Sequence, residues 1–204
     1  MNAEKLRILV ATGNIGKIAE LEKLLAGLPI ELLSLKNFSE VAEVEETGFS
    51  FTENAALKAK GYAVQTGVMS LADDSGLEVD ALGGAPGIYS ARYAGENVGD
   101  KVRIEKLLDE MRNADSADRS ARFVCAMAIT GKNGEILHIA EGFCEGAIAL
   151  APRGANGFGY DPVFIPTGFD KTFGELSDEV KQKISHRARA SIKIIRYLHD
   201  FIAV

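Results

Sequence analysis

Near its N-terminus the chain has a short apolar run, as long as a β-strand, followed by a turn that contains glycine. After the turn, apolar residues recur with the period of an α-helix. The run covers residues 6–10, and Thr12-Gly13-Asn14, a typical turn sequence, follows it. From Gly16 onward apolar side chains recur at the spacing of one helix face, at Ile18, Leu21, Leu25 and Leu28. A strand that leads through a glycine turn into an amphipathic helix predicts an α/β fold, in which helices pack on a sheet.

The rest of the chain alternates between the same two kinds of segment. We expect further strands at residues 30–35, 68–72, 77–82, 123–130 and 135–143, the last two joined by a turn at 132–134. We expect helices at 53–65 and 101–112 and a terminal helix that starts near Ser185, with Ile192, Ile195 and Leu198 on one face. Thr52 is the expected N-cap of the helix at 53–65, and Gly67 ends it. The pattern predicts an α/β fold with a mixed sheet, in one domain of two lobes over residues 1–204.

Charge and composition limit the partners of the chain. It has a formal net charge of −6, and its Lys and Arg residues are scattered rather than clustered. A protein that binds nucleic acid regardless of sequence needs a basic face, so we expect no nucleic-acid partner. A phosphorylated small molecule is compatible with this charge, because a few placed cations, backbone N–H groups and a metal ion suffice to bind it.

The cysteines and the apolar runs bear on the compartment. Cys125 and Cys144 lie in apolar, strand-like stretches and are expected to be reduced and buried, since two cysteines form no disulfide framework. No apolar run approaches the roughly 18 residues of a membrane span, and the start of the chain does not resemble a signal peptide. We therefore expect a cytoplasmic protein with no membrane partner.

The turn between the first strand and the first helix is a candidate phosphate-binding loop, made of Thr12, Gly13, Asn14, Ile15, Gly16 and Lys17. It offers backbone N–H groups and a helix N-terminus to an anion, and Lys17, expected to precede the helix and to be exposed, adds a full charge. It is not a Walker A loop, because two residues instead of four separate its glycines and Ile18 replaces the magnesium-binding Ser or Thr. A plain strand-to-helix turn is the alternative.

Two adjacent carboxylates, Asp73 and Asp74, follow the strand predicted at 68–72. Such a pair is costly unless a cation or solvent compensates it, and hard oxygen ligands of this kind suit magnesium. One of these carboxylates can bind the metal while the other, or the same one, takes a proton from water. Glu45 or Glu46 could supply a further ligand from a neighbouring loop. Alternatively, Asp73 caps a turn and the glutamates are solvated.

Two further segments carry residues suited to nucleotide binding. Phe158 stands between two glycines of the loop 154–160, and Tyr160 follows the second of them. Aromatics in such a loop are exposed unless something, for instance a nucleobase, covers them. They could also fold back onto the core. Lys181 and the Ser185-His186-Arg187 segment can pair with phosphate, and Arg can also donate to a base carbonyl. Ser185 as an N-cap would explain the helix start without any function.

Together these segments resemble the inosine triphosphate pyrophosphatase family, in particular its bacterial branch. The matching stretches are residues 11–17, 45–48, 51–60, 72–93, 157–164 and 181–187, of which the string over 72–77 and 82–93 is the most specific. The resemblance implies an elongated mixed sheet whose two lobes frame a substrate cleft, and a homodimer. It also implies hydrolysis of inosine, deoxyinosine and xanthosine triphosphates to the monophosphate and pyrophosphate, with magnesium (Mg2+) as the cofactor.

The resemblance also assigns roles to individual residues. It makes Asp74 the proton acceptor and a magnesium ligand, with Glu46 as the second ligand position and Asp73 close by. Residues 12–17 hold the triphosphate, and Lys17 stabilises the departing pyrophosphate. The remaining substrate contacts that it implies are Ser75, Phe158, Gly159, Tyr160, Asp161, Lys181, His186 and Arg187. It leaves open whether Glu45 or Glu46 is the ligand.

Two other functions compete with this one. A related pyrophosphatase could act on pyrimidine nucleotides, although the Ser185-His186-Arg187 segment argues against it. A nucleotide-binding sensor without catalysis would need the loop cations and aromatics but not the acidic residues Glu46, Asp73 and Asp74. These carboxylates therefore discriminate an enzyme from a sensor.

Overall fold

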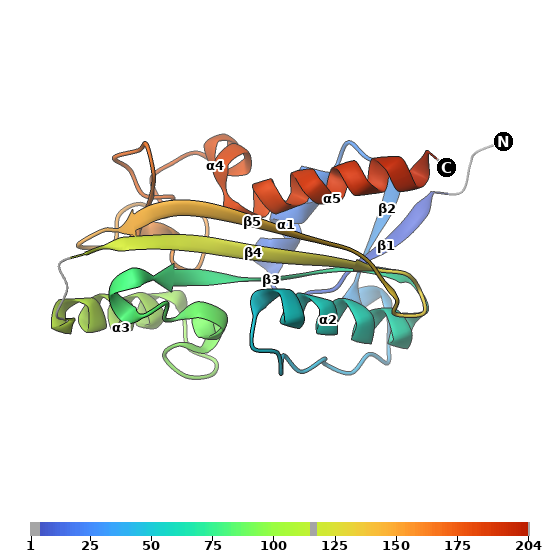
Figure 1. The fold of residues 1–204 in the computed structure, drawn as a ribbon, viewed down its shortest axis with the longest axis horizontal. Helices are drawn as coiled ribbons and strands as arrows, with labels where there is room; N and C mark the ends of the chain where they lie inside the picture. The colour runs from blue at the N-terminus through green and yellow to red at the C-terminus, as the bar shows by residue number, and fades with distance from the viewer. Residues whose placement is uncertain (1–4, 115–117, 204) are drawn as a thin grey trace. The chain divides into compact units, whose positions relative to one another are not determined.

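Strands of both orientations form a six-stranded sheet in the computed structural model of the chain, which describes residues 5–114 and 118–203 (Figure 1). The sheet has the order β2-β1-β3-β4-β5-β6. The strands are β1 (Leu6–Val10), β2 (Ile30–Ser34), β3 (Met69–Val79), β4 (Ser120–Thr130), β5 (Ile136–Ile148) and β6 (Phe164–Pro166). Because β1 pairs in parallel with β2 and β3 while β5 pairs antiparallel with β6, the predicted mixed α/β class is confirmed.

Helices lie between the strands along the chain. They are α1 (Ile15–Leu25), α2 (Phe51–Thr66), α3 (Asp100–Asn113), α4 (Asp178–Ile184) and α5 (His186–Ile202). Helix α4 and strand β6 have no counterpart among the segments predicted from the sequence. Short 3-10 helices occupy residues 35–37, 80–82, 87–92 and 161–163.

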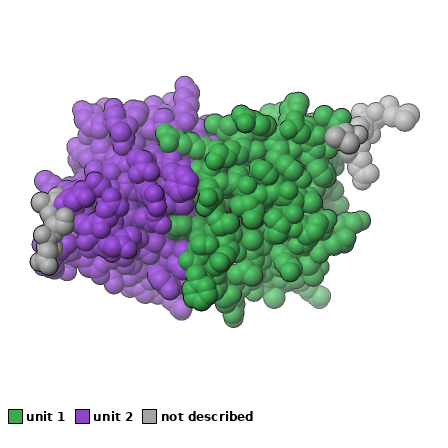
Figure 2. Space-filling model, in the orientation of Figure 1, with its two compact units in different colours: residues 1–74, 125–142, 189–204 green, residues 75–124, 143–188 purple. Residues whose placement is uncertain are grey.

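The chain divides into two compact units, which Figure 2 colours separately. Unit 1 comprises residues 1–74, 125–142 and 189–204, and unit 2 comprises residues 75–124 and 143–188. Strands β3, β4 and β5 each contribute to both units, so the chain passes from one to the other within strands. The expected cleft depends on how the units are placed together and stays a prediction.

In unit 1, helices cover both faces of the strands. Buried side chains of α1 and α5, such as Leu21 and Leu198, pack with Ile8 and Met127 in one apolar cluster. Helix α2 covers the other face with the small residues Ala55, Ala59 and Ala63, all fully buried. Figure 1 shows α2 on one side of the strands and α5 on the other. Small side chains on α2 allow its backbone to come close, and the hydroxyl of Thr130 in β4 donates to the Ala59 carbonyl (3.0 Å).

Unit 2 has its own core between α3 and the outer strands. Apolar residues of α3, among them Ile104 and Leu107, pack with Leu77 of β3 and with an aromatic group. In that group the rings of Phe123 and Phe164 have centroids 4.6 Å apart. Tyr160 of the loop 154–160 belongs to this core, so the core of unit 2 helps to position that loop.

The structure corrects the predicted course of β3. The sequence suggested a strand that ends at residue 72 and a second one from 77, whereas β3 runs without interruption from Met69 to Val79. Asp73 and Asp74 therefore lie inside a strand and not at its end. Two adjacent carboxylates are tolerated there because a lysine from a neighbouring helix compensates each of them.

Two smaller predictions about helices are also wrong. Ser50 and not Thr52 caps α2, because the Ser50 hydroxyl accepts the Glu53 N–H (3.1 Å) and the helix begins at Phe51. On α5, Ile192 is 54% exposed, whereas Ile194 and Leu198 are fully buried. The predicted end of α2 is confirmed, since Gly67 adopts the left-handed conformation (φ 66°) that closes a helix.

Candidate active site

Asp73 and Asp74 are both buried in β3, and each pairs with a different helix of unit 1. Successive side chains of a strand point to opposite faces of the sheet. Asp73 Oδ1 lies 3.2 Å from Lys17 Nζ of α1, and Asp74 Oδ1 lies 3.6 Å from Lys58 Nζ of α2. Asp74 Oδ2 also accepts a hydrogen bond from the amide of Asn54 (3.1 Å). The adjacent acids are thus paired with lysines from two different helices.

Lys58 joins Asp74 to the predicted ligand Glu46. Its ammonium donates to Glu46 Oε1 (2.6 Å), so the two carboxylates share one buried cation. Glu45, the alternative ligand, is exposed. Neither Lys58 nor Asn54 was identified from the sequence, although a signal was present. The signal is that Asn54 and Lys58 stand four residues apart, so both lie on one face of the helix, next to its buried alanines.

The electrostatics of this cluster follow from burial and mutual charge. Burial lowers the pKa of Lys58, but Asp74, Glu46 and Asp73 together outweigh that effect and raise its pKa above the ordinary value. Burial raises the pKa of Asp74, and Glu46 adds to the increase while Lys58 opposes it. Lys58 is thus held charged, and Asp74 is a stronger base than an exposed carboxylate.

The carboxylates of this cluster fit a magnesium ion that is bound jointly with substrate. Over the described residues, no group of three or more His, Cys, Asp or Glu side chains could hold a metal ion. Magnesium, however, is usually bound through one or two carboxylates together with water and substrate phosphates. Glu46 and Asp74 provide two hard oxygen donors close enough to contact the same ammonium. Asp73 belongs instead to the cluster around Lys17.

The candidate phosphate loop is open to solvent at its tip and fixed at its base. The Asn14 side chain caps α1 by accepting the Lys17 N–H (3.1 Å), and the Thr12 hydroxyl accepts the Asn14 N–H (3.2 Å). Gly13 has no neighbouring atom where a side chain would lie, and Ile15 is 76% exposed. The predicted exposure of Lys17 is wrong, because Lys17 lies within the first turn of α1 and its side chain is only 14% exposed.

In unit 2, Phe158 lies close to two cations. The ammonium of Lys181 is 4.7 Å from the centroid of the Phe158 ring, and the guanidinium of Arg187 is 5.8 Å from it. Arg187 is almost fully buried and donates to the Ser75 hydroxyl (2.8 Å). Lys181 donates to the buried Asp161 carboxylate (2.5 Å). The structure therefore brings together five of the predicted substrate contacts, namely Ser75, Phe158, Asp161, Lys181 and Arg187.

Two other predicted contacts face the core. His186 is buried and stacks on Phe123, with ring centroids 4.7 Å apart and an interplanar angle of 12°. Tyr160 is also buried, and its hydroxyl donates to the Ser90 carbonyl (3.0 Å). The expected exposure of both loop aromatics is therefore wrong for Tyr160, while Phe158 is partly exposed. Phe158 remains the aromatic ring of this loop that a base can reach.

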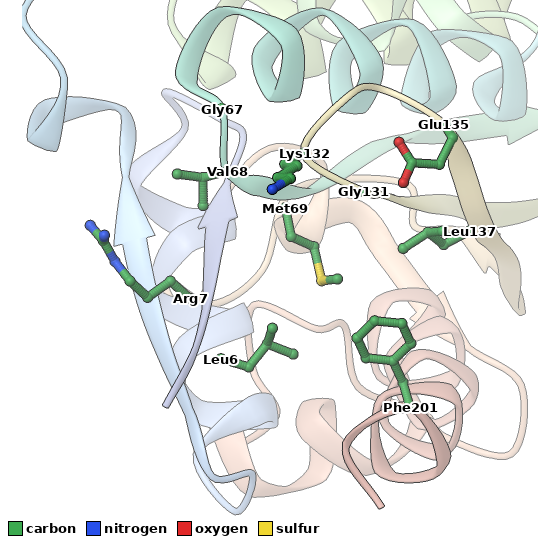
Figure 3. Close-up of a pocket in the computed structure, with 10 residues that line it drawn as sticks. All are labelled: Leu6, Arg7, Gly67, Val68, Met69, Gly131, Lys132, Glu135, Leu137 and Phe201. Carbon is green, nitrogen blue, oxygen red and sulfur yellow. The ribbon is translucent and has the colours of Figure 1, made fainter. Parts of the chain in front are cut away.

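Figure 3 shows a cavity of about 430 Å³ elsewhere in unit 1. Its lining is mostly apolar and includes Leu6, Met69, Leu137 and Phe201. It contains none of the residues predicted to bind substrate or metal. The cavity therefore provides no chemistry for the candidate site.

Comparison with known proteins adds independent information. The model of the Ham1 family matches residues 8–197 of the chain. The dITP/XTP pyrophosphatase of Oceanobacillus iheyensis is 46% identical over 194 residues, which cover 95% of this chain and 98% of that protein. The dITP/XTP pyrophosphatase of Bacillus subtilis is 47% identical over 190 residues, with coverages of 93% and 96%.

Solved structures agree with these sequence matches. A HAM1 protein from Coxiella burnetii superposes with a TM-score of 0.89 at 45% identity and covers 96% of this chain and 99% of its own. The Ham1 protein of Staphylococcus aureus gives a TM-score of 0.84 at 42% identity, with coverages of 95% and 98%. Similarity in sequence and in fold thus extends over nearly the whole chain.

Proposed function

The chain belongs to the Ham1 family, and from this we infer that it hydrolyses non-standard purine nucleoside triphosphates to the monophosphate and pyrophosphate. Its substrates are inosine, deoxyinosine and xanthosine triphosphates, in line with the dITP/XTP pyrophosphatases that it resembles over almost its full length. The observation that supports hydrolysis is the cluster in which Lys58 binds both Glu46 and Asp74. A sensor that only binds nucleotide has no need for this buried acidic pair.

Glu46 and Asp74 are the residues that would hold magnesium. A magnesium ion bound there supplies positive charge that neutralises the phosphates and polarises the α–β linkage. The two carboxylates come from separate segments, Glu46 from the loop before α2 and Asp74 from β3, and Lys58 contacts both of them.

Asp74 is the proton acceptor for the attacking water. Burial raises the pKa of Asp74, which makes it a better base than an exposed carboxylate, and the contact with Lys58 favours its ionised form. The Asn54 amide holds one carboxylate oxygen in place, so that the orientation of the base is fixed before substrate binds. The water that loses its proton to Asp74 attacks the α-phosphorus.

Lys17 and the loop before it bind the departing pyrophosphate. The N-terminus of α1, which begins at Ile15, offers backbone N–H groups to an anion at the loop tip, whereas the Asn14 N–H is donated to the Thr12 hydroxyl. Lys17 contributes its charge from the first turn, where Asp73 holds its ammonium in a fixed position. Interactions that strengthen as charge develops on the leaving group lower the barrier to cleavage.

Unit 2 provides the contacts with the base. Phe158 stacks on the purine ring, and Arg187, with Lys181 beside it, donates to the keto oxygen at position 6. Adenosine carries an amino group at that position, so the same donors would be left unpaired against it. The ring nitrogens of His186 lie at the edge of the imidazole, and Phe123 stacks on one of its faces.

We also propose that the protein works in the cytoplasm as a homodimer with no nucleic-acid partner. The dimer and the compartment rest on the family resemblance. The net charge of −6 supports the absence of a nucleic-acid partner. In the described part of the chain, no helix is long and apolar enough to span a membrane.

Measurement of pyrophosphate release from inosine triphosphate, with and without magnesium, tests the proposal. We expect release with magnesium and none after chelation. Adenosine triphosphate and a pyrimidine triphosphate serve as comparison substrates and should react much more slowly. Tight binding of inosine triphosphate without any pyrophosphate release would favour the sensor, and faster reaction of the pyrimidine nucleotide would favour the other pyrophosphatase.

A further inference from the structure

The loop that carries Phe158 is held by two carboxylates from different parts of unit 2. The Phe158 N–H donates to Asp161 Oδ2 (2.8 Å), within the loop itself. The next amide, that of Gly159, donates to Asp100 Oδ2 (2.7 Å), which belongs to the first turn of α3. Consecutive amides are thus fixed on both sides of the Phe158 side chain.

Both carboxylates are themselves anchored. Asp161 binds Lys181 and leaves so little space that a Cβ on Gly157 (φ 75°) would lie 2.0 Å from its Oδ2. Asp100 binds the guanidinium of Arg103 three residues later through its other oxygen. Arg103 in turn donates to the carbonyl of Ala91 (2.5 Å). Asp100 therefore connects the Phe158 loop to α3 and, through Arg103, to the segment 87–92.

The contact with Gly159 goes beyond what a helix start requires. An acidic residue in a first turn stabilises a helix through the helix dipole and needs no contact with another segment. Asp100 instead directs one oxygen toward a loop 59 residues later in the chain, at a residue with a left-handed backbone (φ 61°). The hydrogen bond selects this one orientation of the peptide that follows Phe158.

We propose that Asp100 is a positioning residue that sets the affinity for the purine base by fixing the orientation of Phe158. The proposal rests on the proposed function, in which Phe158 stacks on the base. In this role Asp100 acts through Phe158 and not by its own contact with the substrate. It acts on the base contact alone, because the triphosphate contacts belong to residues 12–17 and to the Lys58 cluster in unit 1.

The test compares variants of the full-length protein with inosine triphosphate as substrate. Asp100→Ala should raise KM by about ten-fold, the effect of losing a charge-assisted hydrogen bond that is partly exposed to solvent, and should leave kcat within about two-fold. Asp100→Asn keeps an oxygen acceptor for the Gly159 amide, so its KM should stay within about three-fold of wild type. Inhibition by inorganic tripolyphosphate, which has no base, should not change in either variant.

Asp109→Ala is the matched control. Asp109 lies on the same helix and also pairs with an arginine three residues later, Arg112 (2.9 Å), but its side chain is 65% exposed. Its KM should equal that of wild type. An Asp100→Ala protein with unchanged KM overturns the proposal, and so does an equal weakening of tripolyphosphate inhibition, which would mean a general disturbance of the site.

Failure of the proposed function gives a different result. In that case wild type itself releases no pyrophosphate from inosine triphosphate. Calorimetric binding of inosine monophosphate still tests the role of Asp100, because it needs no turnover. We expect Asp100→Ala to weaken this binding by about ten-fold and Asp109→Ala to leave it unchanged.

Discussion

Lys58 Nζ lies 3.6 Å from Asp74 Oδ1, and both side chains are buried in unit 1. The proposed catalytic base is therefore paired with a cation that comes from a helix and not from the phosphate loop. Glu46 shares the same ammonium, so that the charge of Lys58 is divided between the two proposed magnesium ligands. One consequence of this pairing, its effect on the pKa of Asp74, can be measured without a bound ligand.

Asp74→Asn should abolish most of the activity. The amide keeps the size of the side chain but loses both the basicity for water and the charge for magnesium. We expect pyrophosphate release from inosine triphosphate to fall by at least ~100-fold, the lower end of a general-base effect. Asp80→Asn, an exposed acid just after β3, serves as the control and should be fully active. Near-normal turnover of Asp74→Asn at saturating magnesium would contradict this role.

Lys58→Met should raise the pKa of Asp74 in the metal-free protein. Burial already raises the pKa of Asp74 above its ordinary value of 3.8, and the positive charge of Lys58 opposes that increase. Removing the charge disfavours the ionised form further, so the titration of Asp74 must move to higher pH. NMR of carboxyl carbons measures it. Lys60→Met, an exposed lysine on the same helix, should have no effect, and a lower Asp74 pKa in Lys58→Met would refute the pairing.

Lys17→Ala should reduce turnover together with affinity. If Lys17 stabilises the departing pyrophosphate, its loss weakens the transition state more than the bound substrate. We expect kcat to fall by about ten-fold or more, since charge-assisted hydrogen bonds are among the stronger ones. Steady-state kinetics with inosine triphosphate provides the measurement, and Lys23→Ala on the exposed part of α1 is the control. A change in KM alone would mean that Lys17 binds the substrate and the transition state equally, which would contradict the proposed role.

Arg187→Ala should lower the preference for inosine over adenosine triphosphate. A buried donor left unpaired against adenosine costs about 1–3 kcal/mol, so its removal should reduce the ratio of specificity constants by roughly ten-fold. Because Arg187 is almost fully buried, Ser75→Ala, which removes only its hydroxyl partner, accompanies it as a milder variant. Unchanged ratios in both variants, even with lower activities, would place base recognition elsewhere.

Local patterns in the sequence were sufficient for the type of most elements. Apolar periodicity predicted α1, α2 and α3, and Gly67 predicted the end of α2, because these signals depend on neighbouring residues along the chain. The turn before α1 was also recognised in this way. Boundaries were less certain, as the capping of α2 by Ser50 shows, since several hydroxyl residues compete for that position.

The sequence by itself thus determined the α/β class, the family resemblance and the residue types of the site, all of which are carried by short segments. Only the tertiary structure decided which lysine forms an ion pair with which carboxylate. Asp73 and Asp74 are adjacent in the chain, yet a strand turns them to opposite faces, where α1 brings Lys17 to one and α2 brings Lys58 to the other. Likewise, Asp100 meets Gly159 only because α3 and the loop pack together in unit 2. Such pairings depend on contacts between distant segments, and periodicity along the chain carries no information about them.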